Sequence, residues 1–246
     1  MTGGMGVKRV LCNLAVLFAV IAAAVLIAFA LRDVFVRVES SESASGGAKK
    51  PLPTLIIDAG HGGLDGGAVS DSGVRESEIN LDIAKKLDLL MGFLGARTVM
   101  TRDSEDIIYS ESSNSIRKKK IEDMKCRVNL VNAMENAVLI SIHQDKYPSG
   151  GPSGAQTLYA RTDGSKALAE NMQRVLISAL NPGNCRTAAP IPGSIYLMNN
   201  VTCPALLIEC GFLSNQEEEA LLATPEYRLK IAATIAAGYL SFEKEE

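Results

Sequence analysis

The chain has 246 residues, of which 47% are hydrophobic, 22% charged and 5% aromatic. This composition is typical of a globular protein and excludes collagen-like, coiled-coil and disordered chains. Six of the 25 Lys and Arg residues precede Pro51, but only three of the 28 Asp and Glu residues do. The rest of the chain is therefore acidic, which disfavours contact with a phosphate backbone, and we expect no nucleic-acid partner.

The first residues have the pattern of a membrane anchor. Lys8 and Arg9 precede an almost continuous apolar run over residues 10–31. As a helix this run would measure about 33 Å, enough to cross the core of a bilayer. A secretory hydrophobic segment is usually about 7–15 residues long, so we interpret the run as an uncleaved signal anchor. Cleavage after Ala28-Phe29-Ala30 with secretion of the remainder is the alternative.

This interpretation sets the expected topology. Residues 1–9 would form a cytoplasmic tail and residues 10–31 a single span of the cell membrane. Residues 32–53 contain small, polar and proline residues that are typical of a linker. The remaining domain, residues 54–246, would then lie on the extracytoplasmic side.

From Thr54 onward, short apolar runs alternate with amphipathic stretches. Six runs predict strands: Leu55–Asp58, Thr98–Thr101, Ala137–His143, Ala155–Ala160, Ile195–Met198 and Ala205–Glu209. Apolar residues at helical spacing predict helices over 79–94 capped by Ser77, over 121–131, over 168–179 capped by Ser165, and over 226–242. This alternation predicts a single α/β domain with a mostly parallel, twisted sheet of about six strands flanked by helices.

The five cysteines give no metal signature. Cys12 lies in the apolar run, and the other four, at positions 126, 185, 203 and 210, have no C-x-x-C spacing. A cysteine zinc site is therefore disfavoured. We interpret the four as reduced residues, and disulfide bonds remain the alternative.

The two histidines of the chain follow predicted strands. His61 comes just after the first strand in a glycine-rich segment, and His143 ends the third. Ligands of parallel sheets gather beyond the carboxyl ends of the strands. Neutral imidazole is a common metal ligand, so two of them at one sheet edge favour a metal site over two separate structural histidines.

Three glutamates are candidates for the rest of such a site. Glu76 and Glu78 lie where the first helix begins, and Glu76 is preferred because it precedes the predicted cap. Acidic residues there also suit the helix dipole without any metal. Glu209 ends an otherwise apolar strand, so it is either a general base or one half of a structural ion pair.

Together these residues resemble the zinc-dependent N-acetylmuramoyl-L-alanine amidases. The resemblance covers about residues 55–240 and rests on three segments: Asp58-Ala59-Gly60-His61-Gly62-Gly63 with Asp65-Gly66-Gly67-Ala68, Ser141-Ile142-His143, and Glu209-Cys210-Gly211-Phe212-Leu213-Ser214-Asn215. Residues 116–127 and Ile142-His143-Gln144-Asp145 resemble the CwlD spore-cortex branch of that family.

The resemblance implies a function for residues 54–246 as a zinc amidase domain. His61, Glu76 and His143 would be the ligands of one Zn²⁺ per chain, and Glu209 the catalytic glutamate. The substrate would be peptidoglycan, cleaved between N-acetylmuramic acid and L-alanine during spore-cortex maturation. A zinc peptidase that cuts within the stem peptide and an inactive wall-binding module are the alternatives.

Two features of the sequence leave substrate and partner contacts open. Many relatives have Ala-Asn after the second histidine, whereas this chain has Gln144-Asp145, which brings the substrate contacts into question. The basic run Arg117–Lys120 is typical of a solvated helix face. It could also contact anionic wall polymer or an activating protein partner.

Overall fold

The computed structural model describes residues 52–107, 115–148 and 152–242. The chain divides into two compact units at Pro51, and the described residues all belong to the second. The predicted anchor over residues 10–31 and nearly all of the linker over 32–53 lie outside them. In the described part of the chain, no helix combines the length and the apolar character that crossing a membrane requires.

A six-stranded sheet forms the middle layer of the domain, as predicted. Its strands run in the order β2-β1-β3-β6-β4-β5, and all neighbours are parallel except β4 and β6. The strands are β1 (Thr54–Ala59), β2 (Thr98–Met100), β3 (Ala137–Asp145), β4 (Gln156–Tyr159), β5 (Ala189–Pro190) and β6 (Ala205–Phe212).

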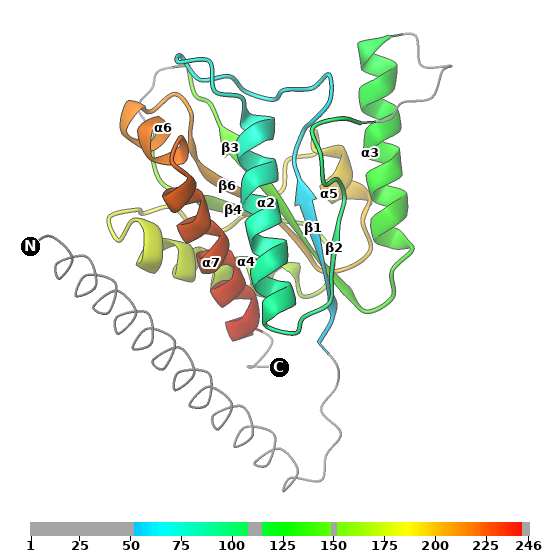
Figure 1. Cartoon of the computed structure of the whole chain (residues 1–246). Coiled ribbons are helices and arrows are strands. Elements are labelled where there is room, and N and C mark those ends of the chain that lie inside the picture. Colours follow the sequence, from blue (N-terminus) through cyan, green and yellow to red (C-terminus); the bar gives the residue numbers. More distant parts are fainter. Residues whose placement is uncertain (1–51, 108–114, 149–151, 243–246) are drawn as a thin grey trace, which may run out of the picture. The chain divides into compact units, whose positions relative to one another are not determined.

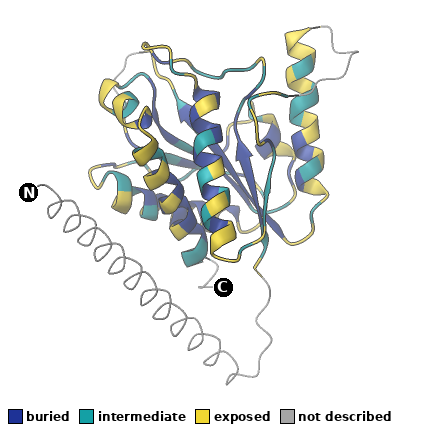
Figure 2. Ribbon diagram, in the orientation of Figure 1, coloured by how far each residue is buried: buried dark blue, intermediate teal, exposed yellow. Residues whose placement is uncertain are grey.

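Helices cover both faces of this sheet (Figure 1). One face packs against α2 (Glu76–Phe93), α4 (Ser165–Leu180) and α7 (Pro225–Phe242), and the other against α3 (Ile116–Asn132) and α5 (Tyr196–Asn200). The short helix α6 (Gln216–Leu222) follows β6. Buried residues concentrate on the strands and on the inner faces of the helices (Figure 2).

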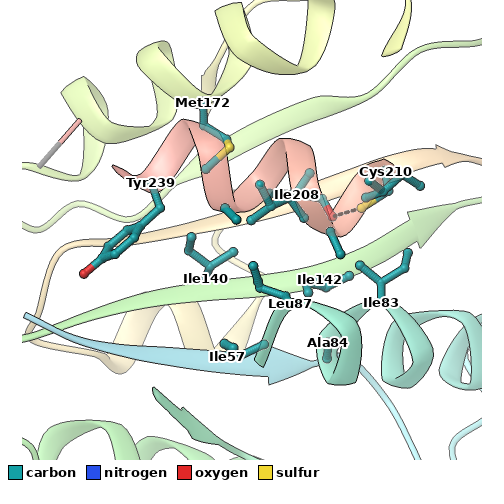
Figure 3. Close-up of a cluster of buried hydrophobic side chains, with 14 of the residues drawn as sticks. Ile57, Ile83, Ala84, Leu87, Ile140, Ile142, Met172, Ile208, Cys210 and Tyr239 are labelled. Atoms are coloured by element: carbon teal, nitrogen blue, oxygen red, sulfur yellow. Dashed lines mark hydrogen bonds between the residues drawn. The ribbon is translucent and has the colours of Figure 1, made fainter. Parts of the chain in front are cut away.

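The larger of the two cores lies beneath α2, α4 and α7. Ile57, Ile140 and Ile208 project into it from three adjacent strands, where they meet Leu87 of α2 and Tyr239 of α7 (Figure 3). All of these side chains have less than 2% of their surface exposed. Because side chains alternate along a strand, Ile56 faces the opposite core beneath α3 and α5.

One predicted strand was wrong. The run Ile195–Met198 lies at the start of helix α5, and the short strand β5 takes the sixth place in the sheet. A short apolar run does not distinguish a strand from a buried helix. At the start of α5, the side-chain amide of Asn199 donates to the carbonyl oxygens of Pro192 and Ile195 and so holds the chain in a helical turn.

Two predicted helix caps were also wrong, and one helix was missed. Arg75 precedes α2, and the Ser77 hydroxyl instead donates to Glu105 from within the first turn. Gly164 precedes α4 with a φ of 78°, while the hydroxyl of Ser165 accepts from the backbone N–H of Ala205. The missed helix is α6, which Asn215 caps. The four cysteines from Cys126 to Cys210 are free thiols.

A buried ion pair joins strand β1 to α3. Arg127 Nη1 lies 2.9 Å from Asp58 Oδ1, and both side chains are at most 3% exposed. The hydroxyls of Thr101 and Ser141 also donate to the Asp58 carboxylate. Although burial by itself would raise it, the charge of Arg127 and these hydrogen bonds lower the pKa of Asp58.

We expect Arg127→Met to destabilise the domain by about 3–5 kcal/mol, because it leaves the Asp58 charge buried without a partner. Arg117→Met is the matched control on the exposed first turn of the same helix and should change stability by no more than about 0.5 kcal/mol. Urea denaturation measures both. Equal midpoints for the two variants would contradict the structural role of the pair.

Candidate metal centre

The turn after β1 positions His61 in an unusual backbone conformation. His61 has a φ of 61°, in the left-handed region that residues other than glycine seldom occupy. Reciprocal backbone hydrogen bonds of 2.8 and 3.0 Å between Gly62 and Asp65 close the loop that follows. Strain of this kind persists where the surrounding structure enforces it, and it is common at functional sites.

Two buried arginines enforce this turn through its carbonyl oxygens. Arg102 Nε donates to the carbonyl of Ala59 at 2.8 Å, and Arg102 Nη2 to that of Gly60 at 3.0 Å. Arg127 Nη1 donates to the Ala59 carbonyl at 2.9 Å and Arg127 Nη2 to the His61 carbonyl at 2.6 Å. Each of these three successive carbonyl oxygens therefore accepts a hydrogen bond from at least one charged donor.

Glu76 lies between the two histidines. Its Oε2 is 3.2 Å from His61 Nε2, and its Oε1 is 2.9 Å from His143 Nδ1. The two imidazole rings meet edge to face, with centroids 4.9 Å apart. One donor atom from each of the three residues lies within 4.8 Å of the others, so the structure brings the predicted ligands together.

Further hydrogen bonds hold the Glu76 carboxylate, which is only 3% exposed. The backbone N–H groups of Ala68 and Gln144 donate to it at 2.8 and 3.1 Å, and the Asn80 amide donates at 3.2 Å. Burial alone would raise the pKa of Glu76, but hydrogen bonds from both histidines lower it. Burial would likewise lower the pKa of His61, yet hydrogen bonds to Asp65 and Glu76 raise it to about 9.

Two glycines allow the cluster to be this compact. A Cβ added at Gly60 would lie 2.2 Å from His143 Nε2. At Gly67, which has a φ of 67°, a Cβ would lie 2.4 Å from Glu76 Oε2 and 2.7 Å from His61 Cδ2. Any side chain at either position would push into the group of ligands.

Glu209 stands beside the cluster on the neighbouring strand. It is the register partner of His143 in the parallel pair of β3 and β6. Its Oε2 is buried and has no hydrogen-bond partner among the described residues. Burial raises the pKa of Glu209 to about 7, against the opposing effect of His143, so this carboxyl group can exchange a proton near neutral pH.

The structure also separates the alternatives that the sequence left open. Glu78 is exposed, whereas Glu76 points into the cluster. Gln144 is 3% exposed, and its side-chain amide donates to Asn80, which in turn donates to Glu76. The Gln144 side chain therefore supports Glu76 through Asn80.

Four supporting residues were not predicted as part of the site from the sequence, namely Asp65, Asn80, Arg102 and Arg127, although Asp65, Asn80 and Arg127 lie in segments that resemble the family. Asp65 had a visible signal, because it lies four residues after His61 in the same glycine-rich segment. The contacts of the two arginines with the turn span 42 residues or more of sequence, so no local pattern predicts them.

The donor set fits a catalytic zinc site. Two imidazole nitrogens and one carboxylate oxygen are three protein ligands of the kind that such sites use, with a further position left for water or substrate. A pocket reaches His61 and His143 from the side of α3 and α5, where Met124, Ile195 and Tyr196 line it. Glu209 Oε2, which has no hydrogen-bond partner among the described residues, would be free to exchange a proton with water beside such an ion.

Comparison with known proteins identifies a family. The model of the N-acetylmuramoyl-L-alanine amidase family matches residues 55–240. The germination-specific N-acetylmuramoyl-L-alanine amidase of Bacillus subtilis is 38% identical over 193 residues, which cover 78% of this chain and 80% of that protein. N-acetylmuramoyl-L-alanine amidase LytC of the same species is 32% identical over 194 residues, covering 77% of this chain and 35% of that protein.

A solved structure agrees with the sequence matches. The CwlD amidase from Clostridioides difficile, determined in complex with the GerS lipoprotein, has 35% sequence identity and a TM-score of 0.75. The match covers 79% of this chain and 100% of that chain.

We expect Gly60→Ala to cost about 1–3 kcal/mol, the usual penalty of overpacking, because the new methyl group meets the His143 ring. Gly92→Ala is the matched control, since no atom outside its own helix lies within 4 Å of the added Cβ. This control should stabilise α2 by about 0.5–1 kcal/mol. Urea denaturation of both variants checks the pair, and a Gly60→Ala midpoint equal to that of Gly92→Ala would contradict the close approach.

Proposed function

Because the chain belongs to the N-acetylmuramoyl-L-alanine amidase family, we propose that its cluster of His61, Glu76, His143 and Glu209 performs the hydrolysis that this family is named for. The bond cleaved is the amide between N-acetylmuramic acid and the L-alanine of the stem peptide. The observation that carries the proposal is the convergence of the three donor groups beside an unpartnered, buried carboxyl group.

His61, Glu76 and His143 would hold one Zn²⁺ per chain. When bound, zinc acts as a Lewis acid on the amide carbonyl and lowers the pKa of water. The contribution of the protein is to fix the three donors in advance. Glu76 receives hydrogen bonds from two backbone N–H groups and Asn80, and the His61 backbone is held by Arg127.

Glu209 would move the proton. Its pKa of about 7 allows the carboxylate to accept a proton from the attacking water and then donate it to the nitrogen of the leaving L-alanine. The proton thus passes from water to the amine, and Glu209 returns to its starting state. Glu209 Oε2 has no hydrogen-bond partner among the described residues, so this atom is available for the transfer.

The cellular role and partners are part of the same proposal. We place the enzyme in spore-cortex maturation, supported by its likeness to a germination-specific amidase. The CwlD relative assembles with a lipoprotein, which supports a protein partner for this chain as well. An anchor over residues 10–31 would hold the domain on the extracytoplasmic side of the membrane, where its substrate lies.

Digestion of purified muropeptides with the full-length protein tests the reaction. Mass spectrometry should find free stem peptides with L-alanine at their amino terminus, together with glycan that has lost its peptide. A zinc chelator should stop the release and added Zn²⁺ should restore it. Shorter peptides would identify a peptidase instead, and zinc binding without cleavage would identify an inactive wall-binding module.

We expect Glu209→Gln to lower amidase turnover by about 10²–10⁴-fold, because the amide cannot accept a proton from water. Elemental analysis should find zinc retained, and the unfolding transition should be no lower, since an unpartnered buried carboxyl group is removed. Glu217→Gln on the exposed first turn of α6 is the control. Loss of zinc in Glu209→Gln would make this residue a ligand, and near-normal turnover would make it structural.

A further inference from the structure

A chain of two charged contacts leads from α3 to the imidazole of His61. Lys120 Nζ lies 2.8 Å from Asp65 Oδ1, and Asp65 Oδ2 lies 3.0 Å from His61 Nδ1. Asp65 is held in place by its own loop, because its backbone is paired with Gly62 and its Oδ1 accepts from the N–H of Gly67. The carboxylate therefore contacts the ring from a fixed position.

Asp65 selects which nitrogen of His61 is left free. An ionised carboxylate only accepts hydrogen bonds, so the contact with Asp65 keeps a proton on Nδ1. In this structure Nε2 faces Glu76 at 3.2 Å, and with Nδ1 protonated it is Nε2 that would give up its proton and present a lone pair to a bound zinc ion. A carboxylate behind a ligating histidine commonly fixes the orientation and tautomer of the ring in this way.

Fold stability does not account for Lys120. Its side chain is 49% exposed and that of Asp65 is 26% exposed, and an ion pair of this kind adds about 0–1 kcal/mol. Lys120 is the fifth residue of α3, which begins at Ile116, and a cation in that half of a helix gains nothing from the helix dipole. The contact of Lys120 with Asp65 therefore serves the metal site and not the stability of α3.

The spacing along α3 supports the same assignment. Lys120 and Arg127 are seven residues apart and lie on one face of the helix. Arg127 binds the backbone carbonyl of His61, while Lys120 reaches the ring of the same residue through Asp65. Both the backbone and the side chain of His61 are thus held from a single helix.

We propose that Asp65 and Lys120 are positioning residues for zinc. Asp65 holds His61 in the orientation and tautomer that present Nε2 to the ion, and Lys120 acts by holding Asp65. This inference rests on the proposed function, because it concerns the affinity of the same site for zinc.

The test measures zinc affinity in the full-length protein by competition with a fluorescent chelator. Asp65→Ala should raise the Kd for zinc by about 10–100-fold, and Asp65→Asn, which keeps an acceptor oxygen, should recover part of that loss. Lys120→Met should raise the Kd by about two- to fivefold, as fits a half-exposed pair. Lys125→Met, on an exposed position of the same helix, should leave it unchanged.

A double variant separates the two roles. If Lys120 acts only through Asp65, then Lys120→Met should add nothing in the Asp65→Ala background. The cobalt(II) form gives a second readout, because its visible absorption reports the arrangement of the ligands and should change in Asp65→Ala. Urea denaturation should show that Lys120→Met and Asp65→Asn remain folded.

Three outcomes would overturn the inference. These are an Asp65→Ala Kd within twofold of the wild type, an unchanged cobalt spectrum, and equal effects of Lys120→Met with and without Asp65. Failure of the proposed function would look different. The wild-type protein itself would then bind no zinc or would leave the muramoyl–alanine amide intact.

Discussion

The buried pair of Asp58 and Arg127 is the interaction on which the rest of the site depends. A charged pair with side chains at most 3% exposed is tolerated only where both partners are fully hydrogen-bonded. Here Asp58 also accepts from Thr101 and Ser141, and Arg127 also donates to Ala59 and His61. The pair therefore ties α3 to the end of β1 at the point where the chain turns toward the ligands.

This arrangement explains how a strained turn can hold a ligand. A residue other than glycine with a φ of 61° costs free energy that local sequence does not recover. Arg102 and Arg127 reach the turn from β2's end and from α3, and between them they bind three successive carbonyls. The strain at His61 is therefore held by tertiary contacts. Glycine is needed at Gly60 and Gly67 for a different reason, because a Cβ there would meet the side chains of the ligands.

The sequence predicts the parts of this structure that depend on local pattern. Five of the six strands and the helices α2, α3, α4 and α7 follow from periodicity, and the two histidines follow from their place at strand ends. The failure at Ile195–Met198 has a physical cause, since four apolar residues fit a strand or a buried helix equally well. The arginine contacts depend on packing between distant segments, which no local pattern encodes.

The two glutamates of this site, Glu76 and Glu209, have environments that shift their pKa values in opposite directions. Glu76 accepts hydrogen bonds from both histidines, two backbone N–H groups and Asn80, so its pKa is lowered and it remains an ionised donor for a cation. The Oε2 atom of Glu209 is buried without a hydrogen-bond partner among the described residues, and desolvation raises the pKa of Glu209 to about 7. Neighbouring carboxyl groups whose environments move their pKa values apart are suited to different tasks. Glu76 is therefore suited to hold a metal ion, and Glu209 is suited to carry a proton. Each role depends on the surroundings of that carboxyl group.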